Sequence, residues 1–191
     1  MSDYKIITDA DVIILKKKNN KFKLEAVKKI KIPCNIIELV ENLEIYNLLK
    51  LLNENLIHKY KIIKNNDNND IILFLSDISN NETNSDSNSE SESESNEKSK
   101  KYYISFADKI TKISSNEIMI NGLKNDIKVN LDDYRKMEID NILIYFKIVN
   151  SELQILLKFN YIGEKIPIYM ENLIGLIFRK IFKNLIKYYS N

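Results

Sequence analysis

The chain has 191 residues, of which 44% are hydrophobic and 29% are charged, a composition that fits one globular domain with a sizeable core. Its 29 basic and 27 acidic residues leave a formal net charge of +2, so the overall charge does not predict nucleic-acid binding. The single cysteine, Cys34, excludes an internal disulfide and a cysteine-cluster metal site, and is typical of a cytoplasmic protein.

The chain begins with three segments that have the apolar patterning of strands. Short β-branched runs occur at 4–7 and 12–15, and a polar stretch at 16–21 separates them from a longer segment at 22–32. In that third segment Phe22, Leu24 and Ala26 share one side. This spacing of two residues is typical of a half-buried strand. We therefore predict three strands, the first two forming an N-terminal addition over residues 1–21.

A proline ends the third strand, and a helical pattern follows it. Pro33 cannot donate to a strand ladder, and Asn35 is suited to cap a helix, with Glu38 completing a capping box. From 36 to 56 the apolar residues hold helical spacing. We predict one helical segment here, with a kink or break near Asn42 or Asn53.

The next two strand candidates enclose a different kind of segment. Residues 59–63 and 70–76 resemble a hairpin joined by an Asn- and Asp-rich turn, and ordered patterning then stops. The segment 79–100 is rich in serine and glutamate and has almost no apolar residues, so we predict a disordered insertion within the domain.

Three serines of this insertion are candidate phosphorylation sites. Ser87, Ser89 and Ser91 each have an acidic residue three positions later, the pattern that acidophilic kinases favour. An unselected low-complexity insert explains the same pattern equally well. The sequence leaves both interpretations open, together with the role of the insertion.

The second half of the chain reads as further strands followed by one long helix. Strands are predicted at 102–106, 117–121, 127–131, 141–149 and 153–162, with Asn150 and Ser151 forming a tight turn before the last. From 167 to 189 apolar residues recur at helical spacing, which predicts one face built for burial. The apolar face holds Met170, Leu173, Ile174, Ile177, Ile181 and Leu185, and the opposite face holds Asn172, Gly175, Arg179, Lys183 and Lys187.

The residues whose side chains could act in catalysis or bind a metal do not form a recognisable catalytic set. Three glycines are too few for a glycine-rich phosphate loop, and His58, the only histidine, is expected on the surface near the end of the first helix. Cys34 is interpreted as a buried structural thiol rather than an activated one. The carboxylates Asp132, Asp133, Glu138 and Asp140 fit a polar loop and lack the spacing of a metal site. We predict no catalytic residues, no metal and no cofactor.

Two stretches resemble the helix-grip superfamily, which includes START, Bet v 1-like and coenzyme-Q-binding proteins. The first runs from Glu25 to Pro33 into the helix that holds Leu39 and is similar to the family's first strand and its bend. The second runs from Leu153 through Pro167 into the closing helix. The resemblance implies an α+β fold over 22–189 in which a curved antiparallel sheet of about six to eight strands grips a long C-terminal helix.

The resemblance also implies a cavity between sheet and closing helix that holds an apolar ligand such as a lipid or an isoprenoid-like molecule. The expected wall residues come from the last strand and the helix: Leu153, Ile155, Leu157, Phe159, Tyr161, Met170, Leu173, Ile174, Ile177 and Ile181. The leading hypothesis is accordingly a non-enzymatic carrier of an apolar ligand. A protein-interaction or co-chaperone-like adaptor with a filled core is the alternative, and an enzyme of the same superfamily is third.

A basic edge on the closing helix offers a possible membrane-facing surface. Arg179, Lys180, Lys183 and Lys187 lie among aromatic residues that would suit a lipid interface, namely Phe178, Phe182, Tyr188 and Tyr189. A solvated helix face opposite the core explains the same residues. The expected partners are an apolar molecule or lipid, a peripheral membrane surface or a protein, and not nucleic acid.

Overall fold

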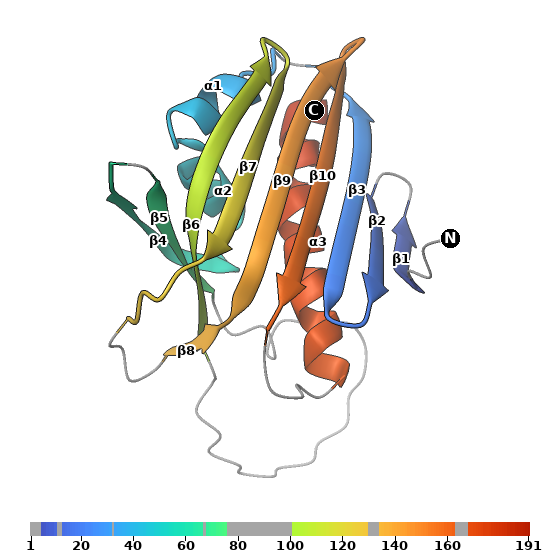
Figure 1. The fold of residues 1–191 in the computed structure, drawn as a ribbon. Coiled ribbons are helices and arrows are strands. Elements are labelled where there is room, and N and C mark those ends of the chain that lie inside the picture. The colour runs from blue at the N-terminus through green and yellow to red at the C-terminus, as the bar shows by residue number, and fades with distance from the viewer. Residues whose placement is uncertain are drawn as a thin grey trace.

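The computed structural model describes residues 5–10, 13–31, 33–66, 68–75, 101–129, 134–162 and 168–191, with side chains described from residue 13 onward but not over 168–173. Within these ranges the chain forms one ten-stranded sheet and three helices, α1 to α3 (Figure 1). The expected α+β class is confirmed, with ten strands where six to eight were predicted. The insertion at 79–100, with Ser87, Ser89 and Ser91, lies outside the described residues.

The sheet is antiparallel apart from one short strand. Its order is β1-β2-β3-β10-β9-β7-β6-β5-β4, so that β1 and β2 extend it beyond β3, and β8 pairs in parallel with β6. The strands are β1 (Lys5–Ala10), β2 (Ile13–Lys18), β3 (Lys21–Lys29), β4 (Ile57–Lys64), β5 (Asn69–Leu75), β6 (Lys101–Ser114), β7 (Glu117–Lys124), β8 (Tyr134–Met137), β9 (Ile139–Val149) and β10 (Glu152–Tyr161).

Two short helices replace the single helical segment expected after β3. They are α1 (Ile36–Glu41) and α2 (Ile45–Leu52), and the chain breaks between them as the sequence indicated, with Leu43 at a positive φ of 64°. Asn53 ends α2 at the second indicated position, where its buried side chain donates to the carbonyl of Leu49.

The predicted capping box at Asn35 is only half right. Asn35 is the N-cap of α1, but its side chain makes no capping hydrogen bond and instead accepts one from the hydroxyl of Tyr189. A contact with a residue 154 positions away has taken the place of the local one. Sequence spacing could not reveal that competition, because it depends on where α3 ends.

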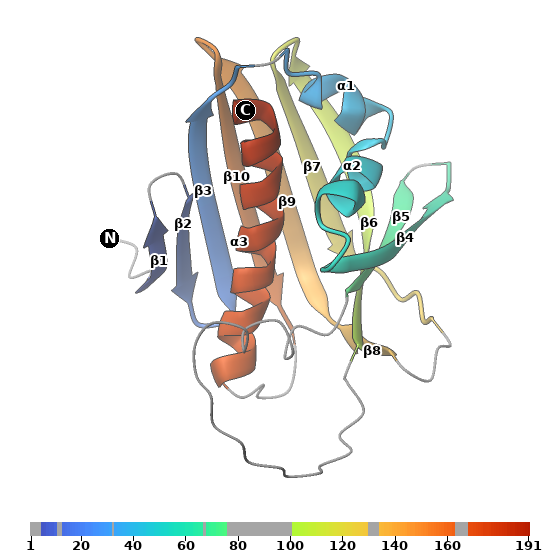
Figure 2. The ribbon, with the colours of Figure 1, turned by 180° about the vertical axis from the view of Figure 1, so that it is seen from behind.

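One face of the sheet carries the core. Phe22, Phe159 and Ile142 stand side by side on β3, β10 and β9, and the buried positions then alternate along each of these strands. The turn that joins β9 to β10 uses Asn150 and Ser151, both at positive φ, as the tight-turn prediction required. All three helices lie on this concave face, with α3 over β3, β10 and β9 (Figure 2).

The closing helix α3 (Ile168–Ser190) buries a wider face than its apolar periodicity predicted. Phe178, Phe182, Ile186 and Tyr189 are buried together with the expected residues Ile174, Ile177, Ile181 and Leu185. Gly175, which we had placed on the polar face, is buried over β2 and β3. A Cβ atom at position 175 would stand 3.0 Å from side-chain atoms of both Leu15 and Phe22. The absence of a side chain there lets the helix lie close to the sheet.

The strand predicted at 127–131 is wrong for its described part, because residues 127–129 have no regular structure. Ile127 and Val129 instead pack on a small cluster on the convex face, formed by Ile72, Phe74 and Tyr103. The backbone NH of Val129 donates to the hydroxyl of Tyr103 rather than to a neighbouring strand. The apolar residues that suggested a strand thus cover a second, minor core.

Candidate functional site

The interior between the sheet and α3 contains seven of the ten residues that the sequence proposed as a cavity wall. Leu153, Ile155, Leu157 and Phe159 are all at most 2% exposed, and Tyr161 at the end of β10 is half-buried. Across from them Ile174, Ile177 and Ile181 are also buried, whereas the side chains of Met170 and Leu173 lie outside the described set. One apolar layer from β10 and another from α3 therefore enclose this space.

Aromatic rings fill the described part of this interior. Phe22 stacks on Phe159 with ring centroids 4.8 Å apart, and Phe159 contacts Phe178 at 4.6 Å. A further pair, Phe146 and Phe182, joins β9 to α3 at 6.4 Å. The two walls therefore contact one another along the helix. The sequence suggested that Phe178 and Phe182 face a lipid surface. The structure corrects this, because both are buried.

A single buried acid interrupts the apolar interior on the side of α2. Asp108 on β6 is fully buried, and its Oδ2 accepts a hydrogen bond of 3.0 Å from the hydroxyl of buried Tyr46. Burial raises the pKa of the Asp108 carboxyl, against hydrogen bonds from Tyr46 and Asn69 that lower it. Its Oδ1 has no hydrogen-bond partner among the described residues. Sequence analysis missed Asp108, although it continues the inward alternation of Ile104 and Phe106.

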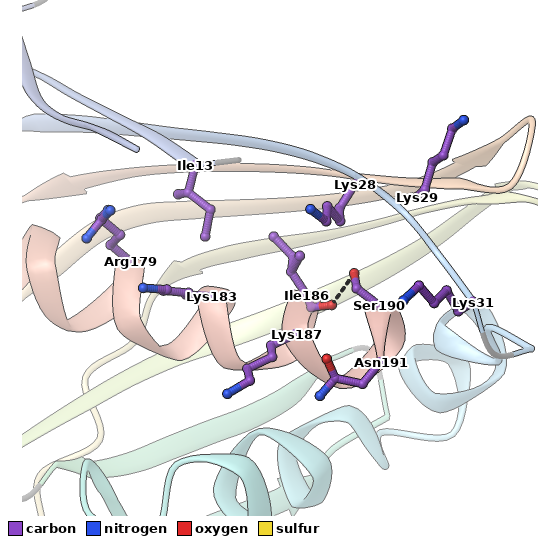
Figure 3. Close-up of a pocket in the computed structure, with 10 residues that line it drawn as sticks. All are labelled: Ile13, Lys28, Lys29, Lys31, Arg179, Lys183, Ile186, Lys187, Ser190 and Asn191. Carbon is purple, nitrogen blue, oxygen red and sulfur yellow. Dashed lines mark hydrogen bonds between the residues drawn. The ribbon is translucent and has the colours of Figure 1, made fainter. Parts of the chain in front are cut away.

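A basic groove lies outside this interior, between β3 and the second half of α3 (Figure 3). It has a volume of about 580 Å³ and is lined by six cationic residues and by no Asp or Glu side chain. Three of the cationic residues, Arg179, Lys183 and Lys187, belong to the basic edge that the sequence predicted. The end of β3 supplies Lys28 and Lys29, and the segment just after it supplies Lys31; the sequence did not connect these three lysines with the helix. Lys180 is exposed but does not line the groove.

The groove exists because β3 continues past its neighbour. The pairing of β2 with β3 stops at Ile13 and Ala26, while β10 pairs with β3 as far as Lys29. Lys28 follows Leu24 and Ala26 on the side that faces α3, so an exposed lysine stands where the core row ends. Its side chain points toward the last turns of α3, and Lys29 points away from them (Figure 3).

The other candidate residues, His58 and Cys34, do not line the groove, and Cys34 packs against the main core. His58 is exposed on β4, not at the end of a helix, and Cys34 is half-buried. Burial raises the pKa of the Cys34 thiol, the opposite of what an activated nucleophile needs.

The predicted carboxylate group does not converge where it is described. Glu138 pairs with Lys124, and Asp140 is exposed, whereas Asp132 and Asp133 lie outside the described residues. Across the described ranges no three His, Cys, Asp or Glu residues are grouped to hold a metal ion. Of the described helices, none combines the length and apolar character that a bilayer span requires.

Comparison with known proteins identifies the fold through structure alone. No family model and no curated protein sequence matches the chain. Human StAR-related lipid transfer protein 5 superposes with a TM-score of 0.61 at 7% identity, over 97% of this chain and 86% of that one. The lipid transfer and protein localization domain of human StarD13 gives 0.61 at 8%, over 96% and 89%. A STAR-related lipid transfer protein from Xanthomonas axonopodis gives 0.60 at 11%, over 98% of both chains.

These likenesses show that the chain has the helix-grip fold of START domains, as the two sequence stretches suggested. They cover nearly the whole chain, including β1 and β2. The neighbours named here are two lipid transfer proteins and one lipid transfer and protein localization domain. Identities this low establish the arrangement of strands and helices and nothing finer.

Proposed function

We propose that the protein is a non-enzymatic carrier that binds an apolar molecule, of lipid or isoprenoid type, between the sheet and α3. The observation that carries the proposal is the pairing of two wholly apolar walls across the concave face: Leu153, Ile155, Leu157 and Phe159 on one side, and Ile174, Ile177 and Ile181 on the other. The lipid-transfer neighbours with the same fold support it. Tyr161, Met170 and Leu173 belong to the same proposed site.

The structure bears on how such a ligand would enter. Phe159 and Phe178 contact each other, so an occupant must separate α3 from β10 and replace their mutual contacts with its own. Because one apolar contact replaces another, the exchange changes the exposed apolar surface of the protein little. The free-energy difference between the two arrangements of the protein is therefore small.

The basic edge of α3 completes the proposal as a docking surface for anionic membranes. Arg179, Lys180, Lys183 and Lys187 present positive charge on the helix that must move. Basic residues close to a membrane surface attract anionic lipid headgroups, and each contributes about 1 kcal/mol to the binding free energy. Docking there would bring the mobile wall to the source of the ligand.

Native mass spectrometry of the full chain tests the carrier proposal. After incubation with vesicles that contain phospholipid and an isoprenoid quinone, we expect one apolar molecule to remain bound through gel filtration. Ile177→Trp fills the space between the walls and should reduce uptake, whereas Leu123→Trp, at an exposed position on β7, is the matched control. Absence of uptake by the folded wild-type protein would refute the proposal.

A second candidate function, an adaptor with a filled core, rests on a different surface. Leu51 of α2 and Tyr188 of α3 are 55% and 43% exposed and both line an open groove of about 710 Å³. Exposed apolar side chains gathered in one groove are typical of protein contacts. A stoichiometric partner that is lost with Leu51→Ser, or on deletion of residues 80–99, would favour this function over the carrier.

A further inference from the structure

We propose that the basic groove between β3 and α3 is a binding site for a phosphate-bearing anion, separate from the apolar interior. Six of its ten lining residues are cationic and none is acidic. The whole chain has almost equal numbers of basic and acidic residues, so an average surface would mix the two signs. The groove concentrates one sign, which favours an anionic occupant.

The positive charge of the groove is not neutralised locally. Elsewhere on the sheet several lysines have carboxylate partners, as Lys16 does with Glu25 and Lys147 with Glu117. None of the six groove cations forms an ion pair with a carboxylate in the described part of the chain. Like charges held together without a counter-charge repel one another, so an anion that binds among them relieves that repulsion.

Arg179 is placed to give the site geometry as well as charge. Its Nε is buried and has no hydrogen-bond partner among the described residues. A buried donor of a charged group left unpaired is unfavourable, and a guanidinium pairs with phosphate through two parallel hydrogen bonds. A phosphate oxygen in the groove would supply the acceptor that Nε lacks.

The shape of the groove indicates an ester rather than a bare inorganic ion. Its volume of about 580 Å³ is that of a small-molecule site, and buried Ile13 and Ile186 form an apolar part of its lining. An organic group linked to phosphate would use both the apolar and the cationic lining. The phosphate can belong to a soluble ester or to the headgroup of a lipid.

The helix dipole accounts for only part of this cluster. Cations near a helix C-terminus are stabilised by the exposed carbonyls, and Lys187 lies in the last turn of α3. Lys31 lies near the same helix end, because its backbone NH donates to the carbonyl of Tyr189. Ser190 already caps one of the last carbonyls by donating to Ile186 (Figure 3). Arg179 and Lys183 precede the last turn of α3, where the effect of the dipole has fallen off, so their position in one groove with Lys28 needs another explanation.

The experiment measures binding of two probes to the full chain: tripolyphosphate by isothermal titration calorimetry, and phosphatidylcholine vesicles with or without phosphatidic acid by co-sedimentation. We expect Lys28→Glu with Lys183→Glu to weaken binding at least about tenfold. Arg179→Lys keeps the charge but loses the planar fork, so a smaller loss is expected. All three positions are at least partly exposed, and thermal unfolding checks that each variant folds.

Two matched controls separate a site from general attraction. For tripolyphosphate, Lys180→Glu makes the same charge reversal on the same helix outside the groove, and for both probes Lys61→Glu with Lys109→Glu makes the double reversal on distant strands. Tripolyphosphate binding that only the groove variants lose supports the proposal with a soluble source. Selective loss of phosphatidic acid binding alone supports it with a lipid source.

Three results would overturn the assignment. They are no binding of either probe, equal loss in the control variants, or tighter binding of a single-stranded RNA oligonucleotide than of both phosphate probes. The site does not depend on the carrier function. A protein that takes up no apolar ligand but binds phosphate in the groove would refute that function and support this one.

Discussion

The hydroxyl of Tyr189 donates a 2.9 Å hydrogen bond to Oδ1 of Asn35, joining the last turn of α3 to the residue that precedes α1. The backbone NH of Lys31 donates to the carbonyl of the same tyrosine at 3.0 Å. Tyr189 is fully buried, and burial raises the pKa of its phenol, so it remains a donor at physiological pH. The C-terminal end of the closing helix is thereby fixed to the chain that leaves β3.

Tyr189→Phe should lower the free energy of unfolding by about 1 kcal/mol, because it removes the hydroxyl donor and leaves Asn35 without that partner. Chemical denaturation followed by circular dichroism measures the change. Tyr188→Phe, at a neighbour that is 43% exposed, is the control and should change stability little. If the two variants lose the same stability, the Tyr189–Asn35 bond does not anchor the helix.

Gly175→Ala should destabilise the protein although alanine favours helices. The added methyl would stand 3.0 Å from Leu15 and from Phe22, and Phe22 cannot easily retreat because it stacks on Phe159. Overpacking costs about 1–3 kcal/mol, against a gain of about 1 kcal/mol in helix propensity. We expect a net loss of about 1 kcal/mol in unfolding free energy.

The background variant Phe22→Leu tests the cause of that loss. A smaller side chain at position 22 makes room for the new methyl, so Gly175→Ala should cost less in this background than in the wild type. Equal losses in both backgrounds would show that the close approach of α3 to β3 is not limited by Phe22. The double-mutant cycle isolates this pairwise term.

The sequence predicted those parts of the fold whose pattern is local. The alternation along β10 and along β3 identified the inward rows, and the 3.6-residue period of α3 identified its buried stripe. Asn150 marked the turn that it forms with Ser151, because asparagine tolerates positive φ better than most residues. Each of these signals depends only on neighbours within a few positions.

What the sequence could not predict depends on how distant segments meet. Lys28 and Lys183 line one groove only because β2 stops short and α3 crosses β3 at that point. Phe178 and Phe182 are buried because α3 buries a wider face against the rest of the protein than the apolar stripe predicted from its sequence. Asp108 was missed for another reason: its inward register was visible, but a charged residue argued against burial.

Asp108→Asn should alter the dependence of stability on pH. Burial raises the pKa of this carboxyl above its value in the unfolded chain, about 3.9. Between the two pKa values the folded state holds a proton that the unfolded state has lost, so wild-type stability falls as pH rises through that interval. Asparagine does not titrate, and its carbonyl can still accept from Tyr46.

Unfolding free energies measured from pH 3.5 to pH 7 check this prediction. The stability of Asp108→Asn relative to wild type should increase with pH and then level off above the folded pKa. Asp140→Asn removes an exposed carboxylate of β9 and is the control. A relative stability that decreases with rising pH would mean that the ionised carboxylate is favoured in the folded protein, contrary to its burial.

Removal of residues 80–99 should leave the fold intact. Leu75 pairs with Tyr102 at the point where β5 and β6 become neighbours, so residues 76–79 and 100 suffice to connect the two strands. A shorter loop loses less entropy on closure, which should raise the unfolding free energy by about 1 kcal/mol. A variant with the same residues in scrambled order keeps the loop length and should match the wild type. Loss of cooperative unfolding on deletion would show that the segment contributes to the core. If the deletion variant folds, its binding of phosphate or of a partner measures any role of Ser87, Ser89 and Ser91 separately from the fold.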